Sequence, residues 1–195
     1  MSDRIIEEYK INNLNIEIWQ DWDCESPADW GNFTIVQFRD NNYTTYKQLE
    51  YSEFVTENDC LTPATLAKLR AGKMFTIDYR SYSNADGGYY YLDGGIPKGQ
   101  VDSQDVNGFI IFNDDYIKGT SYDERRKYAE QDLATYTAWA NGEVYGFTIT
   151  TPDGEFIDSV GGYIGDIDYC KQDADAIAKT IRSSVTATNA QAVHN

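Results

Sequence analysis

Histidine is almost absent from this chain of 195 residues, because the only one is His194, next to the C-terminal residue. Histidine is the usual general base near neutral pH and a common zinc ligand, so its scarcity argues against Ser-His-Asp and Cys-His catalysis and His-rich metal sites. The sequence also lacks the motifs GxxxxGK[ST], GxSxG and GxGxxG. We therefore expect no cofactor and no metal, and no enzyme class is indicated.

Cysteines are few, and long apolar runs are missing. Cys24, Cys60 and Cys170 are an odd number without CxxC spacing, which fits reduced thiols in a cytosol better than a disulfide scaffold or a zinc site. No apolar run approaches the roughly 20 residues of a membrane span, and the charged start MSDRIIEEYKINN is unlike a signal peptide. These features predict a cytoplasmic protein without a membrane partner.

Basic residues are scarce relative to acidic ones, with 16 Lys and Arg against 32 Asp and Glu and a net charge of −16. Affinity for phosphates needs clustered Lys and Arg. The one such cluster, Arg125, Arg126 and Lys127, falls on a predicted helix, where it is typical of a solvated face. We expect no direct binding of nucleic acid.

Two segments have no basic residue at all, from Ile11 to Phe38 and from Tyr128 to Tyr169, and these 70 residues carry 13 carboxylates. If the two segments adjoin in the fold, one face of the protein is strongly negative. Such a face either binds a basic partner or serves only solubility, since net charge keeps proteins apart in a crowded cytoplasm. The sequence leaves both alternatives open.

Turn and capping signals predict three helices. Thr62-Pro63 and Gly72 bound the first, and Thr120 or Ser121 and Asn141-Gly142 bound the second. The third is expected from about Tyr169 to Val185, with Asp166 or Asp168 as its cap. Runs rich in β-branched and aromatic residues predict strands. The predicted strands are 15–20, 33–39, 73–79, 88–92, 108–112, 143–150 and 155–160, the last two joined in an antiparallel hairpin by Thr151-Pro152-Asp153-Gly154. The order of elements predicts an α+β fold with a mixed or mainly antiparallel sheet. We expect one domain over 1–185 and a flexible tail over 186–195.

The stretch WQDWDCESPADWGNF, residues 19–33, contains three of the four tryptophans and four carboxylates. Ser26, Pro27 and Gly31 indicate a single capped helical turn after a strand. We expect the indoles of Trp19 and Trp30 to close the end of the sheet and Trp22 to be exposed. The alternative is an exposed aromatic patch that binds a partner.

Carboxylates are the remaining candidates for chemistry. Asp21, Asp23, Asp158 and Asp166 would form an acid/base pair or a divalent-metal site if they converged. The segment 165–175, GDIDYCKQDAD, superficially resembles a calcium loop, but it lacks the central glycine and the terminal glutamate. The simpler interpretation is a helix start, with Asp at the positive end of the helix dipole.

Several blocks of the sequence, in order, resemble an uncharacterised family of small acidic proteins found in bacteriophages and mobile elements. The blocks lie within residues 15–170 and comprise Asp21-x-Asp23-x-Glu25-Ser26-Pro27-x-x-Trp30-x-Asn32, Asp102-Ser103 with Gly108-Phe109-Ile110, Gly142-Glu143-Val144-Tyr145-Gly146, and Asp158-Ser159 with Gly165-Asp166. Gly31, Val101 and Val160-Gly161 depart from the family pattern. The resemblance implies a phage-type accessory protein, in the cytoplasm of a host cell, and supplies no activity.

We therefore expect a non-enzymatic protein that presents a carboxylate-rich face to a basic host protein. By analogy with acidic phage proteins, its target is a nucleic-acid-binding or defence protein whose cleft it occupies as a DNA mimic. The alternative is a small carboxylate-based enzyme or a divalent-metal-dependent binding protein. The candidate partner-binding residues are Asp21, Trp22, Asp23, Glu25, Asp29, Trp30, Glu143, Asp158, Asp166 and Asp168.

Overall fold

The computed structural model describes residues 4–37, 51–54, 56, 60–82, 87–94 and 106–192. The chain forms two compact units: unit 1 comprises Met1–Glu25 and Gly142–Asn195, and unit 2 comprises Ser26–Asn141. Each unit contains one four-stranded sheet, and all strand pairs in the described part of the chain are antiparallel. The predicted α+β class with antiparallel strands is confirmed.

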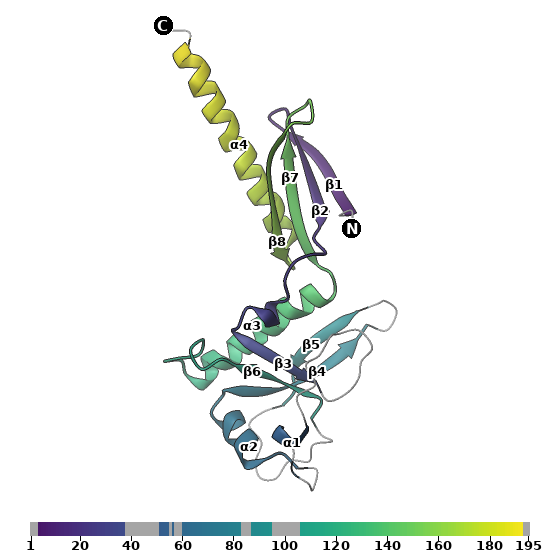
Figure 1. Ribbon diagram of the computed structural model, residues 1–195, viewed down its shortest axis with the longest axis vertical. Coiled ribbons are helices and arrows are strands. Elements are labelled where there is room, and N and C mark those ends of the chain that lie inside the picture. Colours follow the sequence, from purple (N-terminus) through teal and green to yellow (C-terminus); the bar gives the residue numbers. More distant parts are fainter. Residues whose placement is uncertain are drawn as a thin grey trace. The chain divides into compact units, whose positions relative to one another are not determined.

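Unit 1 is a sheet with one helix, α4, on one of its faces (Figure 1). The strand order is β1-β2-β7-β8. The bounds are β1 (Arg4–Ile11), β2 (Leu14–Gln20), β7 (Val144–Thr150), β8 (Phe156–Ile164) and α4 (Ile167–Ala192). Strand β1 was not predicted, and α4 continues past Val185, where the predicted third helix ended.

Helix α4 packs on the sheet through small side chains. Cys170, Ala174 and Ala178 are fully buried at intervals of four residues, one turn apart on the same face of the helix. They lie in one cluster with the buried face of the central strands, which consists of Ile16, Ile18, Phe147 and Ile149. The alternation of buried residues in β2 thus points Ile16 and Ile18 toward α4 and Trp19 to the opposite face.

Polar contacts along α4 hold the helix in register on the outer strands. The Tyr9 hydroxyl in β1 donates to Asp175 over 3.0 Å, and the Tyr163 hydroxyl in β8 donates to Asp173. Burial, and then these hydrogen bonds to carboxylates, raise the pKa of both tyrosines. Two of the many carboxylates of unit 1 therefore have structural partners on the sheet.

Unit 2 is a sheet covered on both faces. The strand order is β3-β6-β4-β5. The bounds are η1 (Pro27–Asp29), β3 (Phe33–Gln37), α1 (Tyr51–Phe54), α2 (Pro63–Arg70), β4 (Met74–Ser81), β5 (Gly88–Leu92), β6 (Gly108–Phe112) and α3 (Tyr122–Ala140). Positions 38 and 39 of one predicted strand, and the last three residues of the predicted tail, lie outside the described residues.

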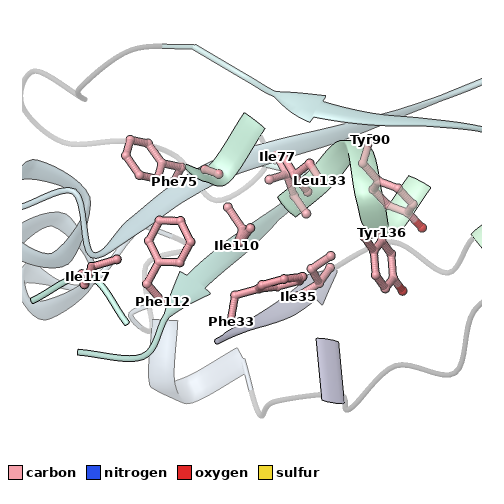
Figure 2. Close-up of a cluster of buried hydrophobic side chains, with 11 residues drawn as sticks. Phe33, Ile35, Phe75, Ile77, Tyr90, Ile110, Phe112, Ile117, Leu133 and Tyr136 are labelled. Carbon is pink, nitrogen blue, oxygen red and sulfur yellow. The ribbon is translucent and has the colours of Figure 1, made fainter. Parts of the chain in front are cut away.

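The larger core of unit 2 lies between the sheet and α3. Figure 2 shows Leu133 and Tyr136 of α3 beside Ile77 and Tyr90 of the sheet. The ring centres of Tyr136 and Tyr90 are 5.3 Å apart. A second cluster joins α1 and α2 to the opposite face. Its buried members are Val36, Phe54, Leu61, Leu69, Met74, Val106 and Phe109.

The predicted helix caps of unit 2 are confirmed. Thr62 accepts from the Thr65 amide over 3.2 Å at the start of α2, and Gly72 follows the helix with a φ of +66°. Ser121 begins α3 in a reciprocal capping box with Glu124. Local chemistry alone therefore located these helix ends correctly.

The outer edge of β5 is closed by the end of α3. The Asn141 side chain accepts from the Gly88 amide over 3.1 Å and donates to the Gly88 carbonyl over 2.9 Å, so that it replaces a neighbouring strand. Thr137 accepts from the Tyr90 amide over 3.0 Å. These contacts protect an edge that would otherwise be open to pairing with another chain.

Asn141→Ala is expected to lower the free energy of unfolding by about 1 kcal/mol, because it leaves the partly buried Gly88 amide and carbonyl without their side-chain partners. Urea unfolding followed by circular dichroism measures the change. Gln131→Ala removes an exposed side chain of the same helix and is the control. An Asn141→Ala protein as stable as the control would show that the edge needs no such partner.

Candidate functional site

One end of the unit 1 sheet collects most of the predicted site residues. The Asp21 amide, just after β2, donates to the Val144 carbonyl over 2.9 Å, and the Gly165 amide, just after β8, donates to the Glu143 carbonyl over 2.7 Å. Three segments far apart in the sequence therefore meet where β2 and β8 end and where β7 and α4 begin. We call this group the acidic end: Asp21, Trp22, Asp23, Glu143, Asp166 and Asp168.

Two carboxylates of the acidic end also organise the backbone around them. Asp21 accepts from the amides of Asp23 and Gly162, over 3.1 and 3.0 Å. Asp166 accepts from the Tyr169 amide over 2.9 Å and so caps α4, as predicted. The side chains of Asp23, Glu143 and Asp168 are exposed, as is that of Glu25 farther along the same loop.

The tryptophans beside the acidic end differ in burial. The Trp22 side chain is 52% exposed, as expected. Trp19 instead lies across the sheet, where its indole nitrogen donates to Thr148 over 3.0 Å. A Cβ on Gly146 would lie only 2.4 Å from the Trp19 ring, so glycine at this position is what admits the indole. Trp19 is therefore part of the sheet structure, and Trp22 is open to contact with a partner.

The negative charge of the protein is concentrated in unit 1. Its sequence has 15 acidic and five basic residues, a net charge of −10, whereas unit 2 has 17 and 11. The ion pairs of unit 1 that the described ranges contain are Lys171–Glu7 and Lys179–Asp175, and neither involves the acidic end. Arg4 of β1 lies opposite Gln20 of β2, next to the acidic end.

Asp158 does not join the acidic end. It lies opposite Ile149 on β7, whereas Tyr145 of the same strand lies opposite Gln20, next to the acidic end. The four residues from Tyr145 to Ile149 correspond to about 13 Å along the strand. Asp158 therefore does not converge with Asp21, Asp23 and Asp166. Among the residues that the structure describes, no group of three or more His, Cys, Asp or Glu could hold a metal ion.

Asp29 and Trp30 belong to unit 2. The predicted capped turn is confirmed, because Ser26 accepts from the Ala28 amide over 3.3 Å and Gly31 follows with a φ of +82°. The expected burial of Trp30 is wrong, since its side chain is 50% exposed. The turn attaches to unit 2 through Pro27, which is buried, and through Ala28, which packs on the larger core between the sheet and α3.

Trp22→Ala and Trp30→Ala are each expected to lower the free energy of unfolding less than Trp19→Ala does, because half of each residue is already exposed to water. Trp19→Ala should cost about 1 kcal/mol, since it removes ring packing and a hydrogen bond. Thermal unfolding of the three variants measures the order of their losses in stability. A large loss in Trp30→Ala alone would restore the core interpretation.

Two glycines to which the sequence analysis gave no structural role help to shape this site. Gly146 and Gly161 each lie within a strand, a position that often marks a bulge or a close approach and could have singled them out. A Cβ on Gly161 would lie 2.6 Å from an Asp21 carboxylate oxygen and 3.1 Å from the Trp19 ring. These glycines leave the space that Trp19 and Asp21 occupy.

None of the helices in the described ranges is long and apolar enough to cross a membrane. Comparison with protein-family models gives no match, and searches of the curated proteins and of the solved structures give no significant match.

Proposed function

We propose that this chain is a non-enzymatic accessory protein that binds a basic partner through the acidic end of unit 1. The observation that carries the proposal is the exposed Trp22 indole among carboxylates from three separate segments. Tryptophan is enriched among the residues that dominate binding energy, because it buries a large area at little entropic cost. Solubility alone requires charge, but it does not require an exposed indole among those charges.

Arginine is the partner side chain that this surface fits best. A guanidinium group stacks on an indole face and donates hydrogen bonds to carboxylates at the same time. Asp23 follows Trp22 in the chain, and the Trp22 ring lies next to Gly142, the neighbour of Glu143; both carboxylates are exposed, as is Asp168 at the start of α4. The partner surface is therefore expected to be rich in arginine, and the binding to weaken with added salt.

The narrower form of the proposal is a phage-type DNA mimic that occupies the basic cleft of a host nucleic-acid-binding or defence protein. The resemblance to small acidic phage proteins and the net charge of −10 on unit 1 support it. In this form Glu25 and Asp158 extend the contact surface on unit 1. Carboxylates would take the places of the phosphates that such a cleft normally binds.

The experiment measures binding of a fluorescein-labelled poly-arginine peptide by fluorescence anisotropy. The double variant Asp23→Asn/Glu143→Gln removes two negative charges from the acidic end. The matched control, Asp153→Asn/Glu155→Gln, also removes two negative charges, but from the exposed turn at the other end of β7. We expect the first variant, and Trp22→Ala, to bind about tenfold more weakly than the wild type, and the control to bind nearly as well.

Equal weakening of the acidic-end variant and its control would contradict the proposal, because net charge alone would then explain binding. The DNA-mimic form has a separate test. Bacterial proteins retained on the immobilised wild type, and lost with Trp22→Ala, should be eluted by double-stranded DNA. If DNA elutes none of them, the partner is basic but the mimicry is wrong.

A further inference from the structure

A second surface with binding chemistry lies on unit 2, on the hairpin of β4 and β5. Tyr89 and Tyr91 project from the same face of β5, with ring centres 5.7 Å apart, and Tyr82 lies 6.1 Å from Tyr89. Arg80 is directly opposite Tyr89, and Asp78 is directly opposite Tyr91. We call these five residues the tyrosine platform.

The rings of the platform are held in place although this part of the sheet is open to solvent. The Tyr91 hydroxyl donates to Asp78 over 2.8 Å, and Arg80 makes a side-chain hydrogen bond to Tyr89. Asp78 is itself fixed, because it accepts from the Asn107 side chain over 2.8 Å and from the Tyr79 amide over 2.7 Å. Rigid aromatic groups lose little entropy when a ligand binds, so the platform is preorganised.

The platform is the open part of a sheet face that is covered elsewhere. Near the start of β4 this face is buried, where Met74 and Phe109 pack in one cluster with residues of α1 and α2. Farther along the same strand, Arg80 and Tyr82 are exposed, and Tyr91 across from them is exposed as well. Tyr90, the residue between the two platform tyrosines of β5, instead faces α3 and is buried.

The charges of the platform select the class of ligand. Arg80 and Asp78 balance each other, in a protein with a net charge of −16 that repels polyanions. Arg80 supplies donors, and Asp78 accepts three hydrogen bonds and keeps room for about one more. Sugar rings offer apolar C–H faces that stack on aromatic rings, and hydroxyl groups that both donate and accept. We infer that the tyrosine platform binds a neutral oligosaccharide.

A purely structural role is the competing explanation, because directly opposed pairs such as Arg80–Tyr89 and Asp78–Tyr91 also stabilise a hairpin. That role predicts changes in stability only. The inference stands independently of the acidic end, since all five platform residues belong to unit 2.

The experiment is isothermal titration calorimetry of the full chain with cellohexaose, chitohexaose and maltohexaose. We expect at least one of them to bind the wild type, and Tyr89→Ala, Tyr91→Ala and Tyr82→Ala each to weaken that binding about tenfold. Tyr91→Phe keeps the ring and loses the hydrogen bond to Asp78, so its affinity for the sugar should lie between those of the wild type and Tyr91→Ala. Tyr169→Ala removes an exposed tyrosine of α4 and is the control.

The inference is overturned if none of the three sugars binds, or if binding persists in all of the platform variants. It is also overturned if a polyproline peptide binds in their place and loses affinity in the same variants, because the platform would then be a peptide site. Far-ultraviolet circular dichroism checks the folding of each variant. Tyr91→Phe makes the smallest change to the hairpin and keeps the test decisive if an alanine variant unfolds.

Discussion

Phe147→Ala is expected to lower the free energy of unfolding of unit 1 by about 3–5 kcal/mol. Phe147 is fully buried on β7, a central strand of the sheet. Its ring belongs to the same cluster as Ile18 and Ala174 and lies 6.0 Å from the ring of Tyr163. Its removal leaves a cavity between the sheet and α4 that these neighbours can fill only in part. A loss of this size threatens a unit of ordinary stability.

Urea unfolding followed by circular dichroism measures the loss, and Phe156→Ala is the matched control. Phe156 lies on β8, in the same hairpin, but 68% of its side chain is exposed, so its removal should cost less than about 0.5 kcal/mol. If the two variants lose the same stability, α4 does not pack on the sheet at Phe147 as the structure shows.

The sequence predicted the elements whose signals are local. Caps at Thr62, Ser26 and Ser121 depend on a side chain and an amide two or three residues away, and each is found where it was predicted. The turn at 151–154 likewise joins β7 to β8, where the Thr151 amide donates to the Glu155 carbonyl.

Strand β1 escaped prediction because it has almost no buried face. Its first five residues are exposed, and Tyr9 and Ile11 are only partly buried. An edge strand of this kind lacks the strict alternation of apolar and polar residues that identifies a half-buried strand. Charged side chains such as Glu7 and Lys10 are typical of protected edges, and they interrupt the apolar pattern that would identify a strand.

The pairing of β2 with β7 was also beyond the sequence signals. The bond from Trp19 to Thr148 joins residues 129 positions apart, and all of unit 2 lies between them in the chain. The acidic end depends on this pairing, because Asp21 and Glu143 meet only when β2 lies beside β7. The charge pattern of the sequence identified most residues of the candidate site. Only the strand register shows that Asp158 lies apart from them.

Asp132→Asn is expected to stabilise the protein at neutral pH by about 1–2 kcal/mol. One Asp132 carboxylate oxygen is buried and has no hydrogen-bond partner among the described residues, and the other accepts from the Tyr116 hydroxyl over 3.4 Å. Burial raises the pKa of Asp132 to about 6, although the Tyr116 bond opposes the shift. At neutral pH the native state must therefore hold an ionised carboxylate at a site that favours the neutral acid.

The pH dependence of this effect gives the decisive test. The unfolded chain releases the proton of Asp132 near pH 4, whereas the native state keeps it until about pH 6, so this group destabilises the protein progressively between those values. Asn carries no charge at any pH. Asp132→Asn and the wild type should therefore be similarly stable near pH 4, and the variant should become the more stable one as the pH rises to 7.

Urea unfolding at each pH measures the difference, and Asp115→Asn, which removes an exposed carboxylate, corrects for the loss of one charge. After that correction, the stability gained by Asp132→Asn should grow between pH 4 and 6 and then level off, because the native carboxyl is largely ionised above its pKa. A difference that stays constant from pH 4 to 7 would mean that the carboxylate is solvated in the native protein, and that water reaches the interface between Tyr116 and α3.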